Sequence, residues 1–211
     1  MKDITTLLFD IDGTILDTRE FIIQATEYAL KTLCYQVPER SVIAQNVGKV
    51  FPDYYGTLSG SSEKIKELID AHWEFQYSNM HLSVLFPNTL QALKAVKEKG
   101  YKLGAVTTRS RKTSKQTLLD SGIFDLFDIV IAGDDVKESK PHPAPLLKAL
   151  ELVGEVPEKA IMIGDSHLDI EAGKNAGTKT IRAIYGFHTD NLHEPEPNFI
   201  VEDISELLKL L

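Results

Sequence analysis

The chain has 211 residues, of which 43% are hydrophobic and 26% are charged, and its formal net charge is −8. This composition is that of a globular protein with a substantial core, and the length suits one domain with an insertion. The acidic balance argues against nucleic acid or an anionic membrane surface as a partner. Cys34 is the only cysteine, so no internal disulfide can form, and no apolar run approaches a membrane span. We therefore expect a cytoplasmic protein without membrane or nucleic-acid partners, present as a monomer or a weak homodimer.

The first predicted element is a buried strand at residues 4–9, and it ends in charge. Its sequence, ITTLLF, is followed at once by Asp10, Asp12 and Gly13. A short apolar run of this kind is typical of a parallel strand that is buried on both faces. Two carboxylates at its end require an explanation, because buried charge is costly unless it is paired or bound to a metal. A plain polar turn is the alternative interpretation.

Residues 15–85 show helical patterns and no strand pattern. Apolar residues at helical spacing predict three helices, at residues 21–33, 38–47 and 62–76. Residues 56–62 are rich in glycine and serine and predict a loop. We interpret residues 15–85 as an inserted all-helical domain, and residues 1–14 with 86–211 as an α/β core domain.

Strands and helices alternate from Pro87 onward. The expected strands are residues 101–107, 128–132, 160–163, 178–184 and a short one at 199–201. The expected helices are residues 90–99, 113–120, 145–153, 167–176 and 204–211. Strands that are separated by helices imply right-handed crossovers, so the fold class is α/β with a doubly wound parallel sheet.

Polar residues gather at four of the expected strand ends or in the loops after them. They are Asp10, Asp12, Thr107, Thr108, Arg109, Lys140, Asp165 and Asp169. The carboxyl ends of the strands lie on one edge of a doubly wound sheet, where such sheets bind their ligands. We therefore expect these residues to converge, although they are far apart in the sequence.

The predicted cluster has the groups that phosphoryl transfer requires. The carboxylates of Asp10, Asp12 and Asp165 repel one another unless a cation lies among them, and hard oxygen ligands suit Mg²⁺. Asp169 shares a helix face with Asp165 and can bind the metal or its water. Lys140 offers a point charge for a phosphate. A carboxylate nucleophile, a second carboxylate, a divalent cation and a cationic clamp together predict transfer through an aspartyl-phosphate.

Four sequence segments resemble the motifs of the haloacid dehalogenase-like hydrolases. They are FDIDGT at 9–14, Thr107 in VTT, Lys140 in KPHP and GDSHLD at 164–169, and they stand in the family's order with a helical insertion after the first. The resemblance implies a Rossmann-like core, a mobile helical cap and Mg²⁺ as cofactor.

The resemblance also implies a role for each residue. Asp10 would be the nucleophile, and Asp12 would protonate the leaving group and then activate water. Asp10, the backbone carbonyl of Asp12 and Asp165 would hold Mg²⁺, with Asp169 in support. Thr107, Thr108 and Lys140 would bind the phosphoryl group.

Finer likenesses bear on the reaction and the substrate. Thr14 after Asp12-Gly13 is similar to the phosphatase branch, whereas sugar phosphomutases more often carry valine there and dehalogenases lack the second aspartate. Residues 106–113 and 173–180 look more like a pyrophosphatase branch than like the phosphoglycolate phosphatases, which usually have Asn in place of Thr108. We expect a Mg²⁺-dependent phosphatase for a small phosphorylated metabolite, with phosphoglycolate or pyrophosphate favoured. A sugar phosphomutase and a catalytically idle binding module are the alternatives.

Three basic residues are candidates for contact with an anionic substrate. They are Lys49, which follows a glycine in the helical insertion, and Arg109 and Arg111, which follow a strand end of the core. A solvated surface charge is the alternative interpretation of each.

Overall fold

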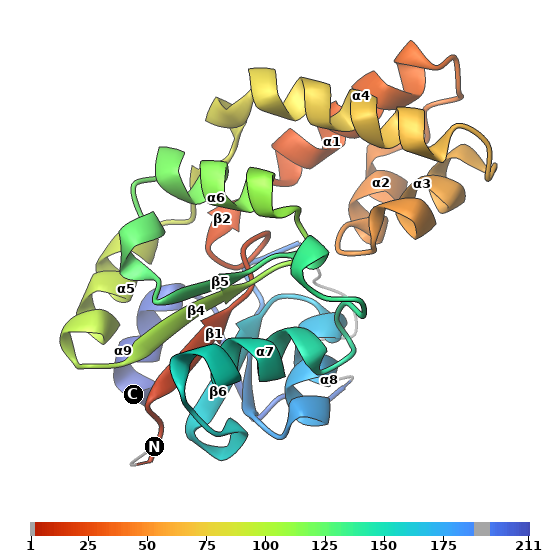
Figure 1. Ribbon diagram of the computed structural model, residues 1–211. Helices are drawn as coiled ribbons and strands as arrows, with labels where there is room; N and C mark the ends of the chain where they lie inside the picture. Colours follow the sequence, from red (N-terminus) through yellow and green to blue (C-terminus); the bar gives the residue numbers. More distant parts are fainter. Residues whose placement is uncertain (1–2, 188–194) are drawn as a thin grey trace. The chain divides into compact units, whose positions relative to one another are not determined.

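The structure is a computed structural model that describes residues 3–187 and 195–211. It divides into two compact units, Met1–Asp17 with Leu85–Leu211, and Thr18–Val84. We call the first the core unit and the second the helical unit (Figure 1). No helix in the described part of the chain is both long and apolar enough to cross a membrane.

A six-stranded sheet forms the centre of the core unit, in the order β5-β4-β1-β6-β7-β8. Its strands are β1 (Thr6–Phe9), β4 (Lys102–Val106), β5 (Ile129–Ile131), β6 (Ala160–Gly164), β7 (Lys179–Ala183) and β8 (Phe199–Val201). Every neighbouring pair is parallel. The chain runs outward from β1 to β5 and then returns to β6, so the strand order reverses between β1 and β6. Open α/β sheets bind ligands at such a switch point.

Helices cover both faces of this sheet (Figure 1). They are α5 (Thr89–Glu98), α6 (Arg111–Asp120), α7 (Ala144–Val153), α8 (His167–Ala176) and α9 (Leu207–Leu210). Short 3₁₀ turns are η2 (Phe124–Leu126), η3 (Gly133–Asp135), η4 (Pro157–Lys159) and η5 (Ile204–Glu206). The α/β class and the doubly wound parallel sheet predicted from the sequence are confirmed.

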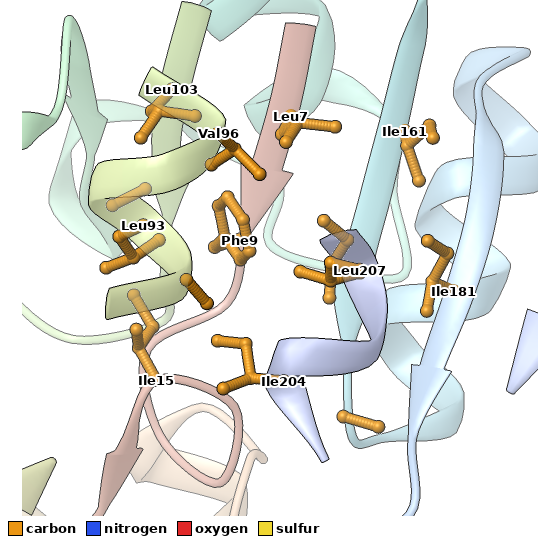
Figure 2. Close-up of a cluster of buried hydrophobic side chains, with 14 of the residues drawn as sticks. Leu7, Phe9, Ile15, Leu93, Val96, Leu103, Ile161, Ile181, Ile204 and Leu207 are labelled. Atoms are coloured by element: carbon orange, nitrogen blue, oxygen red, sulfur yellow. The ribbon is translucent and has the colours of Figure 1, made fainter. Parts of the chain in front are cut away.

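The central strand is buried on both faces because its side chains alternate between two hydrophobic clusters. Leu7 and Phe9 pack with α5 and α9 on one face (Figure 2), and Leu8 packs with α7 and α8 on the other. Full burial of a side chain of this size stabilises the fold by roughly 1.5–3 kcal/mol. The strand that carries Asp10 is therefore anchored from both sides.

The helical unit contains α1 (Arg19–Thr32), α2 (Arg40–Asn46), α3 (Phe51–Ser59), α4 (Ile65–Ser78) and the 3₁₀ turn η1 (Met80–Leu82). The loop predicted for residues 56–62 is correct at residues 60–62 but wrong at residues 56–59, because α3 continues through Gly56 to Ser59. Tyr54, Tyr55 and Leu58 are buried at helical spacing. Their burial outweighs the cost of a glycine within a helix, which is about 1 kcal/mol.

Two very short strands lie at the connections between the units, where the sequence pattern showed none. β2 (Leu16–Asp17) and β3 (Val84–Leu85) form a separate two-stranded sheet. A strand of two residues is too short to show a periodicity, which explains why it was missed.

Candidate active site

The candidate site lies where β1, β4 and β6 end, on both sides of the switch point. Asp10 follows β1, and its backbone N–H donates to the carbonyl of Ile163 in β6 at 2.9 Å. Asp165 follows β6 directly, and Thr107 follows β4. Parallel pairing in register therefore brings these residues to one edge of the sheet.

Three buried carboxylates meet at this edge. Asp10, Asp165 and Asp169 each offer an oxygen, and these oxygens lie within 4.8 Å of one another. We call these three residues the acid cluster. Asp165 and Asp169 are 1% and 0% exposed, so water screens their charges poorly. Such an arrangement requires positive charge nearby.

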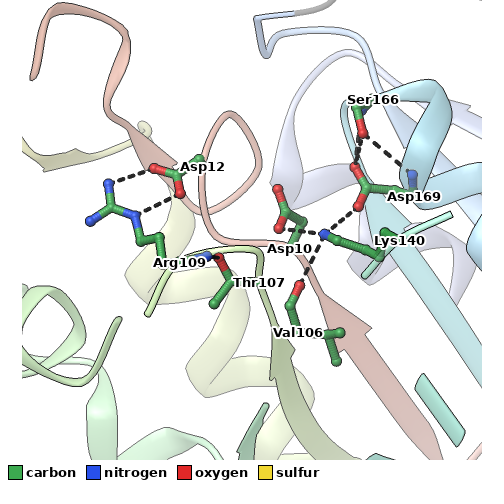
Figure 3. A network of polar contacts seen from close by, with 8 residues as sticks. All are labelled: Asp10, Asp12, Val106, Thr107, Arg109, Lys140, Ser166 and Asp169. Carbon is green, nitrogen blue, oxygen red and sulfur yellow. Dashed lines mark hydrogen bonds and ion pairs between the residues drawn. The ribbon is translucent and has the colours of Figure 1, made fainter. Parts of the chain in front are cut away.

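Lys140 supplies part of that charge from inside the cluster (Figure 3). Its Nζ donates to Asp10 Oδ1 at 2.7 Å, to Asp169 Oδ1 at 2.6 Å and to the carbonyl of Val106 at 3.1 Å. Burial opposes the ammonium charge, but Asp10 and Asp169 more than offset this and raise the pKa of Lys140. Lys140 is therefore a charged lysine whose three N–H donors all have acceptors.

One ammonium does not compensate the whole cluster. Burial raises the pKa of Asp10 well above its usual range, Lys140 lowers it, and the neighbouring carboxylates of Asp169, Asp12 and Asp165 raise it further. A further cation placed among the carboxylate oxygens would relieve this repulsion. The donor set of buried carboxylate oxygens fits a hard divalent cation such as Mg²⁺.

The start of α8 orients Asp169. Ser166 is the N-cap, and its hydroxyl and its backbone N–H both donate to Asp169 Oδ2, at 2.6 and 3.1 Å. A Cβ at Gly164 would overlap the side chain of Asp169, so only glycine fits there. The other carboxylate oxygen, Oδ1, is the one that faces Lys140.

Asp165 is held by residues that the sequence analysis did not single out. The backbone N–H of Phe187 donates to Asp165 Oδ2 at 2.7 Å, and the hydroxyl of Tyr185 donates to the carbonyl of Thr14 at 2.9 Å. A Cβ at Gly186 would overlap both the backbone at Gly13 and the side chain of Asp165. These residues follow β7, the neighbour of β6. Phe187 acts through its backbone N–H and Gly186 through its lack of a Cβ, so a search for polar side chains at strand ends could not find them.

Asp12 lies outside the acid cluster and pairs with Arg109 (Figure 3). Arg109 donates from Nε to Asp12 Oδ2 and from Nη2 to Asp12 Oδ1, both at 2.6 Å. Its Nη1 donates to Thr117 Oγ1 in α6 at 3.0 Å. The carboxylate predicted to transfer protons and the arginine predicted to contact substrate therefore bind each other.

The remaining predicted residues have different surroundings. Thr107 is buried, and its hydroxyl accepts from the N–H of Arg109 at 3.2 Å. Thr108 is half-buried, and its carbonyl lies against Gly133, where a Cβ would overlap it. Arg111 pairs with Asp135. Lys49 belongs to the helical unit, where its Nζ donates to Asn46 Oδ1 at 2.7 Å, and its contact with substrate stays a prediction.

Arg182 is a second buried cation near the acid cluster that the sequence analysis treated only as part of a strand. It lies on β7 in register with Gly164 of β6, and it is 1% exposed. Burial lowers its pKa, while Asp165 and Asp169 act in the opposite direction. Its charge therefore contributes to the electrostatic balance of the cluster from the neighbouring strand.

The fold and site define a doubly wound α/β protein with a cluster of buried carboxylates at its switch point that fits a divalent cation. The chain belongs to the haloacid dehalogenase-like hydrolases, whose family model matches residues 7–183. It is 36% identical over 210 residues to pyrophosphatase PpaX of Bacillus cereus, covering 99% of this chain and 96% of that protein. The family predicted from the sequence is confirmed.

Two solved structures show the same fold across nearly the whole chain. One is a predicted phosphoglycolate phosphatase from Haemophilus somnus, with a TM-score of 0.90 and 25% identity over 100% of this chain and 99% of that one. The other is a haloacid dehalogenase-like family hydrolase from Streptococcus pneumoniae, with the same TM-score of 0.90, 25% identity and the same coverage of 100% and 99%. The helical insertion is thus part of the matched fold.

Proposed function

We propose that this protein is a Mg²⁺-dependent phosphatase that hydrolyses a small, strongly anionic phosphate substrate through an aspartyl-phosphate on Asp10. The observation that carries the proposal is the position of Asp10, which follows the central strand and contacts a buried, charged lysine within a cluster of carboxylates. The names of the relatives, a pyrophosphatase and a predicted phosphoglycolate phosphatase, support pyrophosphate and phosphoglycolate as the first substrates to test.

Each residue has a role in the proposed reaction. A carboxylate oxygen of Asp10 forms a bond to phosphorus while the bond to the leaving group breaks, and Asp12 gives that leaving group its proton. Asp12 then takes a proton from the water that hydrolyses the acyl phosphate. Lys140 holds the nucleophile through Oδ1 at 2.7 Å, and with Thr107 and Thr108 it binds the phosphoryl group.

The residues that would hold Mg²⁺ are the acid cluster and the backbone carbonyl of Asp12. When bound, Mg²⁺ would neutralise charge on the phosphoryl oxygens. We also propose that the helical insertion, residues 15–85, acts as a cap over the site. Such a cap admits small substrates and excludes large ones, as lids generally do.

A side-by-side comparison of kcat/KM tests this function. The substrates are pyrophosphate, phosphoglycolate, a glucose phosphate and a nucleoside monophosphate, each with Mg²⁺ and with excess chelator. We expect pyrophosphate or phosphoglycolate to be preferred and all hydrolysis to stop in chelator. A hexose phosphate that wins by tenfold, about 1.4 kcal/mol in transition-state binding, would contradict the substrate choice. Isomerisation of that hexose phosphate would instead indicate the phosphomutase.

A further inference from the structure

The two oxygens of Asp12 are both occupied by one guanidinium group (Figure 3). The Nε and Nη2 groups of Arg109 contact Oδ2 and Oδ1 of Asp12 at 2.6 Å each. The pair is largely buried, with 8% of the Arg109 side chain and 14% of the Asp12 side chain exposed. In this arrangement both carboxylate oxygens accept from Arg109, so a leaving group that takes a proton from Asp12 competes with the guanidinium for one of them.

Arg109 is fixed at its backbone as well as at its side chain. Its N–H donates to Thr107 Oγ1 at 3.2 Å, and its carbonyl accepts from the N–H of Gly133 at 2.7 Å. Its Nη1 donates to the buried hydroxyl of Thr117 at 3.0 Å. The guanidinium is therefore held in one orientation, two residues along the same loop from the proposed phosphate ligand Thr107.

We propose that Arg109 is a positioning residue that holds Asp12 in the resting enzyme and exchanges it for the anionic leaving group of the substrate. This inference rests on the proposed function. A guanidinium binds carboxylate and phosphate groups with the same pair of parallel N–H donors, so a leaving group that carries either anion competes directly with Asp12. Release of Asp12 then coincides with arrival of the correct substrate. A leaving group without a negative charge leaves Asp12 paired, so the exchange contributes to specificity.

Three arginine variants separate this role from a general effect of charge. Arg109→Gln removes the paired donors, and Arg40→Gln is the matched control, because Arg40 pairs with Glu20 and Glu27 within the helical unit and its side chain is 52% exposed. Activity is measured on pyrophosphate or phosphoglycolate and on p-nitrophenyl phosphate, whose leaving group carries no anionic substituent beyond the reacting oxygen. Arg109→Lys keeps the charge without the paired donors.

Arg109→Gln should lower the ratio of kcat/KM for the anionic substrate to kcat/KM for p-nitrophenyl phosphate by about tenfold or more, mainly through KM for the anionic substrate. Arg109→Lys should restore only part of this ratio, and Arg40→Gln should leave it within about twofold. Equal losses on both substrates in Arg109→Gln would overturn the proposal, because they would show a general effect on the site.

A measurement that needs no turnover follows the exchange itself. The ¹⁵Nε–H signal of Arg109, assigned by its absence from Arg109→Lys, is recorded with Mg²⁺ before and after addition of methylenediphosphonate, a non-hydrolysable analogue of pyrophosphate. We expect the signal to move on addition of the analogue. A fixed signal in a protein that binds the analogue by calorimetry, or no binding at all, would contradict the exchange. If the unmodified protein hydrolyses neither pyrophosphate nor any phosphate ester tested, the proposed function fails, and this signal still reports on Arg109.

Discussion

The side chain of Lys140 has two roles in this site that a substitution cannot separate. It compensates the charge of Asp10 and Asp169 in a buried place, and it contacts the proposed nucleophile. Removing one partner from a buried ion pair commonly costs about 3–5 kcal/mol, because the other charge is left uncompensated. Loss of activity after a substitution of Lys140 could therefore result from lower folding stability or from the lost contact with the nucleophile, and activity alone would not distinguish the two. Asp10 and Asp12 allow cleaner tests, because an amide has nearly the same shape as the carboxylate and because Lys140 keeps its ion pair with Asp169 after Asp10→Asn.

Asp10→Asn and Asp12→Asn should fail at different steps. Asp10→Asn removes the attacking oxygen, so no phosphoenzyme should form. Asp12→Asn keeps the nucleophile but removes proton transfer, so formation and breakdown of the phosphoenzyme should both slow by roughly 10²–10⁴-fold. Mass spectrometry of acid-quenched protein measures the phosphorylated fraction, and circular dichroism checks that both variants remain folded. Phosphate trapped on a residue other than Asp10 would contradict the assignment.

At the scale of single elements, the first turn of α8 connects helix stability to the site. The hydroxyl of Ser166 accepts from the N–H of Asp169 as an N-cap and donates to Asp169 Oδ2. The same side chain thus stabilises the helix and fixes the orientation of the Asp169 carboxylate in the acid cluster. Glycine can replace serine as an N-cap at little cost in stability, whereas the hydrogen bond to Asp169 is lost with any residue that lacks a hydroxyl. Two substitutions at this position can therefore distinguish the effect on helix stability from the effect on Asp169.

Ser166→Ala should cost about 1 kcal/mol of stability, whereas Ser166→Gly should cost only a few tenths of a kcal/mol, because glycine is tolerated at an N-cap. Both variants lose the hydroxyl that holds Asp169, so both should bind Mg²⁺ less tightly to a similar extent. Urea unfolding measures the stabilities, and calorimetric titration measures Mg²⁺ affinity. Ser166→Thr, which keeps a hydroxyl, is the control. Mg²⁺ affinity that follows stability across the three variants would refute the separate role.

At the scale of the whole molecule, the sequence predicts which strand ends come together but not how all of their side chains pair. Hydrophobic runs predicted the strands, and the parallel topology then predicted that Asp10 and Asp165 meet, which the structure shows. Pairing of Asp12 with Arg109 was not predictable, because it depends on side-chain directions in two loops. The continuation of α3 through Gly56 depended on burial of tyrosines, which local propensity does not include.

The acid cluster should also make the stability of the whole molecule depend on pH and Mg²⁺ together. The pKa of Asp10 is raised in the folded protein by burial and by its carboxylate neighbours, against an ordinary value of about 4 in the unfolded chain. Between those two values the folded state binds more protons than the unfolded state. The contribution of Asp10 to stability is therefore fully present below about pH 4 and is lost as the pH rises through the folded pKa.

Mg²⁺ should reverse this loss, because it binds the deprotonated cluster and competes with the proton. With free Mg²⁺ at about 100 times its dissociation constant, binding stabilises the folded state by about 2.7 kcal/mol, which corresponds to a rise in Tm of roughly 5–10 °C. We expect the rise at pH 7.5 to exceed the rise at pH 5. Thermal unfolding with and without Mg²⁺ at both pH values measures it. Asp165→Asn should remove most of the rise, whereas Asp125→Asn, which changes an exposed carboxylate on η2, should keep it. An equal rise at both pH values, or a full rise in Asp165→Asn, would show that Mg²⁺ binds elsewhere, since binding at the acid cluster displaces the proton that Asp10 binds at lower pH.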